Sequence, residues 1–182
     1  EKKKFDKAHK SFVDARLAFE KEHLPDRLAD WLKQRPEDKQ QEKLGIWQVI
    51  GPFAADDFKK AFAKEFAPEK EIDLGKNYGE LKWTPRPGWK DGQVHNTLTG
   101  NNSANYLYRT IKLSAAGPLE ISLGRDDAIK VWLNGKSVLA KEVTGGAAAD
   151  QDKVTLTLKE GRNDLLVKIV NASGPSGFYF ST

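Results

Sequence analysis

The sequence has 182 residues, of which 38% are hydrophobic and 10% aromatic, enough to fill the core of one ordinary domain with an appendage. Its formal net charge is +4, but basic and acidic residues are interspersed, and the one basic run is Lys2-Lys3-Lys4. Nucleic-acid binding needs a concentrated basic face, so that function is disfavoured. No apolar run approaches the roughly 18 residues that span a bilayer. The absence of Cys excludes disulfides, thiol nucleophiles and thiolate metal ligands.

The first part of the chain has the spacing of amphipathic helices. Over residues 5–34 apolar positions recur every three or four residues, with charged residues between them. Pro25 interrupts this pattern because it lacks a backbone donor, and it suits the first turn of a second helix. The sequence therefore predicts a helix–Pro–helix segment over residues 1–44. Its apolar stripe comprises Phe5, Ala8, Phe12, Ala15 and Phe19, then Leu28, Trp31 and Leu32.

After Leu44 the pattern changes from helical spacing to the two-residue alternation of strands. Residues 46–50 predict a strand that ends at Gly51-Pro52, and residues 57–66 predict a short helix. Residues 67–104 are rich in Gly, Pro and Asn and predict a long irregular insertion. Such a length is unusual unless the segment carries function or packs as a flap.

The remainder of the chain is a succession of short strands. Strands at this spacing, with no helices between them, indicate a sandwich or jelly roll and not a parallel α/β sheet. The predicted fold is therefore mostly β, an antiparallel β-sandwich of jelly-roll type over residues 45–182 with the helical segment before it. The expected strands are 106–113, 119–123, a hairpin within 124–138, 154–158, 165–170 and 178–180.

The hairpin is the most informative stretch. Asn134-Gly135 tolerates positive φ at both central positions of a type I′ turn, whose twist matches the strands it joins. Alternation places Ile129, Val131 and Leu133 on one face and Trp132 on the other. If the aliphatic face is the core, Trp132 lies on the outer surface or under the long insertion.

A series of short motifs runs along the chain in a fixed order. They are Phe19-Glu20, Leu24-Pro25, Ala29-Asp30-Trp31, Ile46 to Phe53, Phe66 to Glu69, Ile72-Asp73, Tyr106 to Arg109, Asp126 to Gly135, Gly161 to Asn163, Leu165 to Lys168 and Gly177 to Phe180. In this order they resemble a β-sandwich region of large planctomycete proteins that combine cytochrome c-like domains with domains of unknown function. The hairpin and the last strand also look like galactose-binding-type jelly rolls, including sugar-binding domains attached to glycoside hydrolases.

This resemblance implies a non-catalytic, carbohydrate-binding-like module of a larger extracytoplasmic bacterial protein, periplasmic or secreted. Its expected partners are a polysaccharide or oligosaccharide and the neighbouring domains of the parent chain, without nucleic acid or membrane insertion. A chain without Met that opens on Glu1 fits an excised domain or a processed product. Haem attachment requires Cys, so any cytochrome function would lie outside these residues.

Asp126 and Asp127 are the candidate metal ligands. In lectin-like sandwiches that this turn resembles, adjacent aspartates hold Ca²⁺, which in turn binds sugar hydroxyls. Ca²⁺ takes about six to eight oxygen ligands, and Asn134 with Asp150 or Asp152 could add some. The alternative is structural: one aspartate caps the turn by accepting backbone amide hydrogen bonds, and the other faces water.

Aromatic side chains are the candidate sugar platforms, because their faces stack on the apolar C–H faces of pyranose rings. They also supply ordinary core mass with a polar tip, so a structural role stays open for each. Trp83 and Trp89 lie in the irregular insertion and are expected to be exposed. The ligand-binding candidates are Trp83, Trp89, Tyr108, Arg125, Asp126, Trp132 and Asn134.

Two other functions compete with sugar binding. In one, the chain is a structural or protein-interaction domain whose helical stripe docks on neighbouring domains or on another copy. In the other it is a hydrolase, but the sequence contains no nucleophile elbow, His-Glu-x-x-His pair or phosphate-binding Gly loop. Asp126 and Asp127 are also adjacent, and strand neighbours point to opposite faces, which is unsuitable for the carboxylate pair of a glycosidase.

Overall fold

The structure is a computed structural model that describes residues 9–16, 18–19, 22–23 and 42–182. The chain divides into two compact units, Glu1–Lys39 and Gln40–Thr182. The described residues of the first unit are helical, and the ring of Phe19 stacks on that of His23 with centroids 4.2 Å apart. Most of the rest of the predicted helix–Pro–helix segment, including its second helix, lies outside the described residues. Its last residues, 42–44, form a strand and not a helix, so the predicted boundary at residue 44 is wrong. Among the described helices, none has the length and apolar character needed to cross a membrane.

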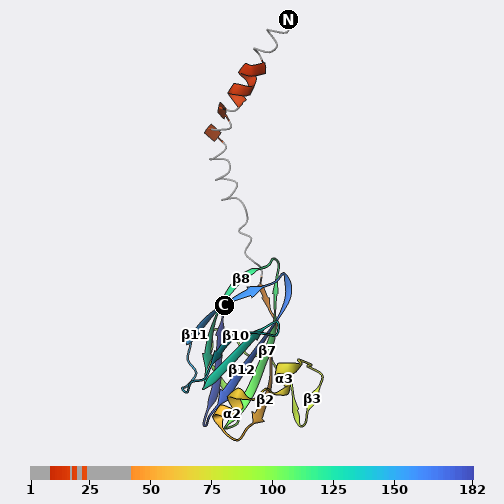
Figure 1. Ribbon diagram of the computed structural model, residues 1–182, viewed down its shortest axis with the longest axis vertical. Helices are drawn as coiled ribbons and strands as arrows, with labels where there is room; N and C mark the ends of the chain where they lie inside the picture. Colours follow the sequence, from red (N-terminus) through yellow and green to blue (C-terminus); the bar gives the residue numbers. More distant parts are fainter. Residues whose placement is uncertain (1–8, 17, 20–21, 24–41) are drawn as a thin grey trace. The chain divides into compact units, whose positions relative to one another are not determined.

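The second unit contains two antiparallel sheets packed face to face (Figure 1). The seven-stranded sheet consists of β1 (Glu42–Leu44), β2 (Trp47–Ala54), β5 (Thr84–Arg86), β7 (Ser103–Leu113), β9 (Ala128–Leu133), β10 (Lys136–Lys141) and β12 (Gly161–Asn171). The four-stranded sheet consists of β6 (His95–Leu98), β8 (Gly117–Arg125), β11 (Asp152–Leu158) and β13 (Ser176–Ser181). The mostly β, antiparallel sandwich predicted from the sequence is confirmed.

The order of strands places distant parts of the sequence side by side. The larger sheet runs β10-β9-β12-β7-β2-β5, with β1 also paired to β7, and the smaller runs β11-β8-β13-β6. β12 and β7 pair along eleven residues each, so they form the middle of the larger sheet. β1 extends this sheet N-terminally of residue 45, where the sequence places the start of the sandwich.

The inner core fills the space between the two sheets. Strand alternation directs one face of each sheet into this space, and the residues there are aliphatic or aromatic. Ile129, Val131 and Leu133 belong to it, as their alternation predicts. Phe178 and Phe180 of the facing sheet meet Trp47 edge-on, with ring centroids 5.1 and 5.3 Å away. The hairpin is also confirmed, because Asn134 and Gly135 have φ values of 50° and 78°.

Two sequence predictions about the middle of the chain are wrong. β2 does not end at Gly51-Pro52 but continues to Ala54, because a register shift between Ile50 and Phe53 accommodates a residue without a backbone donor. Residues 67–104 are not irregular either. They contain α3 (Ala67–Lys70), β3 (Asn77–Tyr78), β4 (Leu81–Lys82), β5 and β6. Elements of two to four residues are too short to produce a periodic pattern.

A second packed layer covers the outer face of the seven-stranded sheet. We call residues 55–83 the cover; it contains α2 (Phe58–Ala63), α3 and the β3–β4 hairpin, which lie together beside β2 and β7 in Figure 1. Asp57 caps the N-terminus of α2, and its side chain accepts a hydrogen bond from the backbone N–H of Lys60 at 2.7 Å. The outer core under the cover comprises Ile50, Ala61, Phe66, Trp83, Ala104, Tyr106, Tyr108, Ala128, Leu166 and Val170.

Candidate functional site

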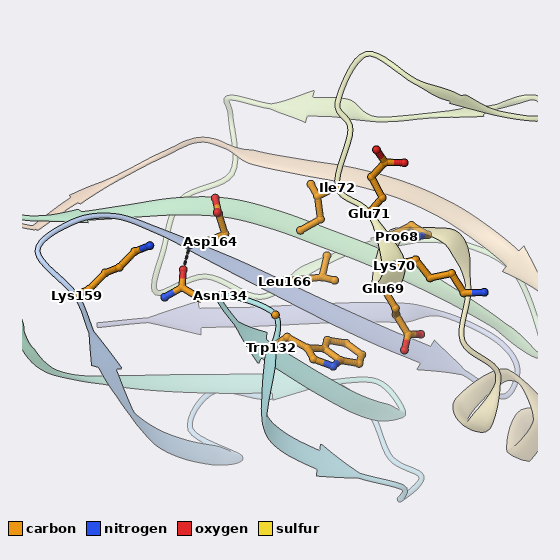
Figure 2. A pocket seen from close by; sticks show the side chains of 11 residues that line it. Pro68, Glu69, Lys70, Glu71, Ile72, Trp132, Asn134, Lys159, Asp164 and Leu166 are labelled. Atoms are coloured by element: carbon orange, nitrogen blue, oxygen red, sulfur yellow. Dashed lines mark hydrogen bonds between the residues drawn. The ribbon is translucent and has the colours of Figure 1, made fainter.

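A cavity of about 420 Å³ lies between the cover and the end of the β9–β10 hairpin. Figure 2 shows side chains of the α3 segment on one side of it and Asn134 and Lys159 on the other. A volume of this size falls in the range of small-molecule sites, roughly 300–1,000 Å³. The lining residues are Pro68, Glu69, Lys70, Glu71, Ile72, Trp132, Asn134, Gly135, Lys159, Asp164 and Leu166.

The apolar part of the cavity comes from two paired strands. Trp132 of β9 and Leu166 of β12 are register partners, so both side chains lie on the outer face of the sheet. Trp132 is half-buried and packs against the outer core. The side chain of Trp132 therefore lies where its alternation predicts, on the outer face and next to the insertion.

The hairpin side of the cavity is fixed by hydrogen bonds from Asn134. Its Oδ1 accepts from the backbone N–H of Asp164 at 2.9 Å, and its Nδ2 donates to Oδ1 of Asn163 at 2.9 Å. Its own backbone N–H donates to the carbonyl of Asp164 at 2.8 Å. Because both ends of the amide are engaged, Asn134 holds the turn against β12 and offers a ligand a rigid edge.

Asp164 is an acidic group of the cavity that is held by two donors. Its Oδ1 accepts hydrogen bonds from the Tyr108 hydroxyl at 2.6 Å and from Nε of Arg162 at 3.0 Å. Burial, and then the hydrogen bond to Asp164, raise the pKa of Tyr108 to about 12, so Tyr108 remains a donor at neutral pH. Among the described residues both bonds go to Oδ1, so Oδ2 can accept from a ligand hydroxyl.

The opposite side of the cavity is fixed by a buried ammonium. Nζ of the fully buried Lys168 donates to Oε1 of Glu69 at 2.9 Å and to the carbonyls of Lys64 and Phe62 at 2.7 and 3.2 Å. The Tyr106 hydroxyl donates to the same carboxylate oxygen. Burial lowers the pKa of Lys168, while the hydrogen bond to Glu69 raises it. Lys168 thus fastens α2 and α3 to the sheet and positions this part of the cavity.

Positive charge stands at the edge of the cavity. Lys70 and Lys159 are exposed and have no ion-pair partner within the part of the chain that the structure describes. Glu71 on the same rim is paired with Lys76 at 3.1 Å. The cavity therefore combines an indole, a free carboxylate oxygen and two ammonium groups.

The Asp126-Asp127 pair lies elsewhere, in the loop between β8 and β9. Asp127 is buried; its Oδ1 accepts from the backbone N–H of Gly145 at 2.7 Å and its Oδ2 from that of Ala172 at 2.8 Å. Burial, and then the charge of Asp127, raise the pKa of half-buried Asp126. Asp127 thus has the structural role that the sequence offered as the alternative. Its two bonds join loops that follow β10 and β12.

The metal-ligand role of Asp126 and Asp127 stays a prediction. The described residues contain no group of three or more His, Cys, Asp or Glu side chains placed to hold a metal ion. The additional ligand candidates are already engaged. Asp152 bonds Nε of Arg125 at 2.9 Å and also pairs with Lys141, and Asp150 accepts from the Ser122 hydroxyl at 2.6 Å. Arg125 therefore lies in an ion pair and not at the cavity.

The two tryptophans of the insertion differ from their expected positions. Trp83 is only 6% exposed and packs in the outer core, with its ring centroid 6.1 Å from that of Tyr108, so the prediction of an exposed Trp83 is wrong. It is buried because the cover folds onto the sheet. Trp89 is half-buried and stacks parallel to His95 with centroids 4.6 Å apart.

The structure therefore brings together only some of the predicted ligand-binding residues. Trp132 and Asn134 line the cavity, and Tyr108 reaches it through Asp164. Asp164 and Leu166 were missed, although alternation along β12 places both on the face of Trp132 once β9 and β12 are paired. The α3 residues had no such signal in the sequence, because their position depends on the cover.

No family model matches the sequence, and no curated protein matches it. Among solved structures, a PA14 sugar-binding domain from an RTX adhesin is 16% identical, with 75% of this chain and 87% of that chain covered and a TM-score of 0.40. A family 35 carbohydrate binding module from Clostridium thermocellum is 12% identical, with 77% and 95% covered and a TM-score of 0.36.

Parts of larger enzymes are also similar to this chain. An α-xylosidase from Xanthomonas citri is 18% identical, with 44% of this chain covered and a TM-score of 0.34, and the chain spans only 9% of that enzyme. A β-glucosidase from Kluyveromyces marxianus in complex with glucose is 13% identical, with 74% and 16% covered and a TM-score of 0.43. Identity and TM-score are low throughout, so the strand pairing described above defines the fold.

Proposed function

We propose that this domain is a non-catalytic module that binds carbohydrate in the cavity beside Trp132. The observation that carries the proposal is a half-buried indole that shares one cavity with fixed polar groups. A pyranose ring has apolar C–H faces, which stack on an aromatic ring, and hydroxyls at its edge, which need hydrogen-bond partners. Trp132 supplies the first, and Asp164 and Lys159 supply the second.

The carboxylates of the cavity suit binding better than hydrolysis. A glycosidase uses one carboxyl group as proton donor and a second as nucleophile or base. Glu69 is paired with Lys168, and Asp164 accepts hydrogen bonds from Tyr108 and Arg162. Both carboxylates are thus held in place by donors of the protein itself, which suits the fixed hydrogen-bond acceptors of a binding site.

The test is retention of the protein in native gels that contain a soluble β-glucan, xylan, mannan or galactan, followed by calorimetry with the matching oligosaccharides. We expect at least one polysaccharide to retard the wild type, and Trp132→Ala to weaken that binding about tenfold or more, the effect of losing roughly 1.4 kcal/mol. Trp89→Ala is the matched control, because it removes an indole outside the cavity and should leave retention unchanged.

Two results would contradict this function. The first is a wild type that no polysaccharide retards. The second is retention that Trp132→Ala leaves unaltered while Trp89→Ala abolishes it. Absence of retention together with self-association in sedimentation at high concentration would favour the alternative, a structural or protein-interaction domain.

We also infer a larger, extracytoplasmic bacterial parent protein and a Ca²⁺ ion at Asp126 and Asp127. Both inferences are supported by the resemblance to planctomycete and lectin-like sandwiches described for the sequence. In the loop the two carboxylates are neighbours, and burial and then the charge of Asp127 raise the pKa of Asp126. Cell fractionation of the full-length protein tests the location, since recovery in the cytoplasm would contradict it.

A further inference from the structure

A second hollow, of about 370 Å³, adjoins the same hairpin turn. It is lined by Leu133, Asn134, Lys136, Val138, Thr155 and Thr157. Asn134 lines both hollows, and the chain that contributes Thr157 to the second hollow contributes Lys159 to the first. Two separate segments therefore run from one hollow to the other, which makes the hollows neighbours.

The boundary between the hollows is low and rigid. It consists of the turn Asn134-Gly135, and Asn134 is fixed by its bonds to Asn163 and Asp164. Gly135 has no side chain, and a Cβ built there would meet no atom within 4 Å other than those of its two chain neighbours. The boundary therefore has open space beside Gly135.

The second hollow has the chemistry of a site for polar, hydroxylated groups. Thr155 and Thr157 are two residues apart on β11, so their hydroxyls project from the same face of the strand. Both are exposed, and no hydrogen bond from either hydroxyl is found among the described residues. Lys136 adds an ammonium group, and Leu133 and Val138 add apolar surface. An aromatic platform is found only in the first hollow.

We infer that the module recognises an oligosaccharide of several units, with one ring against Trp132 and a later unit, beyond the turn, against Thr155 and Thr157. This inference rests on the proposed function and specifies its ligand class. A monosaccharide contacts only the first hollow, where the indole provides the main contact. Each additional unit that reaches the second hollow adds hydrogen bonds from two hydroxyls and an ammonium without a second association cost.

The experiment is calorimetry with two series, glucose, cellobiose and cellotetraose, and xylose, xylobiose and xylotetraose. We expect affinity to rise about tenfold from the monosaccharide to the tetrasaccharide in the series that the wild type binds. The double variant Thr155→Val, Thr157→Val removes both hydroxyls at nearly constant volume. It should lose most of that rise and leave monosaccharide affinity unchanged. Thr144→Val, outside both hollows, is the matched control.

A second variant tests the path across the turn. Gly135→Asn adds a side chain above the boundary with a residue type that tolerates positive φ. It should lower tetrasaccharide affinity several-fold, and more than it lowers monosaccharide affinity, because Gly135 also lines the first hollow. Melting temperatures close to that of the wild type establish that both variants are folded.

The outcomes separate this inference from the proposed function. Equal affinity for the monosaccharide and the tetrasaccharide, with Trp132→Ala still abolishing binding, overturns the two-hollow arrangement and leaves the proposed function intact. A chain-length effect that neither variant reduces also overturns it. A wild type that binds no member of either series, and is retarded by no polysaccharide, overturns both.

Discussion

The two packed regions on either side of the seven-stranded sheet are held together in different ways. The inner core between the sheets is a cluster of aliphatic and aromatic side chains, and its buried Arg109 pairs at one margin with Asp91 at 2.8 Å. The outer core also contains apolar residues, but the cover is fastened through the buried Lys168 and its bonds to Glu69 and two backbone carbonyls. Apolar packing tolerates small shifts, whereas a buried charge requires every partner to be in place.

This difference matters because the candidate site belongs to the outer region. The α3 side of the cavity is positioned by Glu69, so its geometry depends on an ammonium group 99 residues away in sequence. The inner core contributes to the cavity only indirectly, through the strands that it stabilises. Loss of the cover should therefore change the sugar binding that we propose, and loosening of the inner core should change stability alone.

The largest expected effect is that of Lys168→Met. This variant leaves the carboxylate of Glu69 without its ammonium partner and two backbone carbonyls without that donor. Removal of one partner from a buried ion pair costs about 3–5 kcal/mol. We expect the free energy of unfolding in urea to fall by that amount and sugar affinity to fall with it. Unchanged stability would show that apolar packing alone holds the cover.

A double variant separates the charge from the packing. Lys168→Met combined with Glu69→Leu replaces both members of the pair with apolar groups of similar size, which is often neutral for stability. We expect it to recover much of the loss. Tyr106→Phe is the milder probe, since it removes one hydrogen bond to Glu69 and should cost about 1 kcal/mol.

The second prediction concerns Leu107, which is fully buried in the inner core. Leu107→Ala should lower the free energy of unfolding by about 2–5 kcal/mol, through lost apolar burial and the cavity that remains. Sugar affinity of the folded protein should stay within twofold of the wild type, as measured by calorimetry. A large loss of affinity in a folded Leu107→Ala protein would contradict the separation of the two regions.

The sequence predicts the inner region far better than the outer one. Alternation in each long strand identifies the inner face, so Ile129, Val131 and Leu133 were assigned correctly, and the Asn134-Gly135 turn follows from local chemistry. The cover depends on contacts between α3 and β12, about a hundred residues apart, and on elements too short for a period. For that reason the buried position of Trp83 and the cavity residues from α3 could not be predicted.

Asp126 differs from Glu69 in its neighbour, which is another carboxylate, that of Asp127, and not an ammonium group. Its pKa is raised from 3.8 by burial and then by Asp127, so the folded protein holds the proton more tightly than the unfolded chain. The favourable contribution of such a group is complete below its unfolded pKa and is lost as the pH rises through its folded pKa. At neutral pH, ionised Asp126 therefore opposes folding.

Asp126→Asn should accordingly raise the melting temperature at pH 7. The difference in melting temperature between this variant and the wild type should vanish near pH 3, where Asp126 of the wild type is protonated and uncharged, as asparagine is. Asp127→Asn is the control, and it should lower the melting temperature, because Asp127 accepts hydrogen bonds from the backbone of Gly145 and Ala172.

If Ca²⁺ binds here, calcium should raise the melting temperature of the wild type at pH 7 and have less effect on Asp126→Asn. A lower melting temperature for Asp126→Asn without calcium would mean that the backbone hydrogen bond from Ala147 to this carboxylate outweighs its burial and the charge of Asp127.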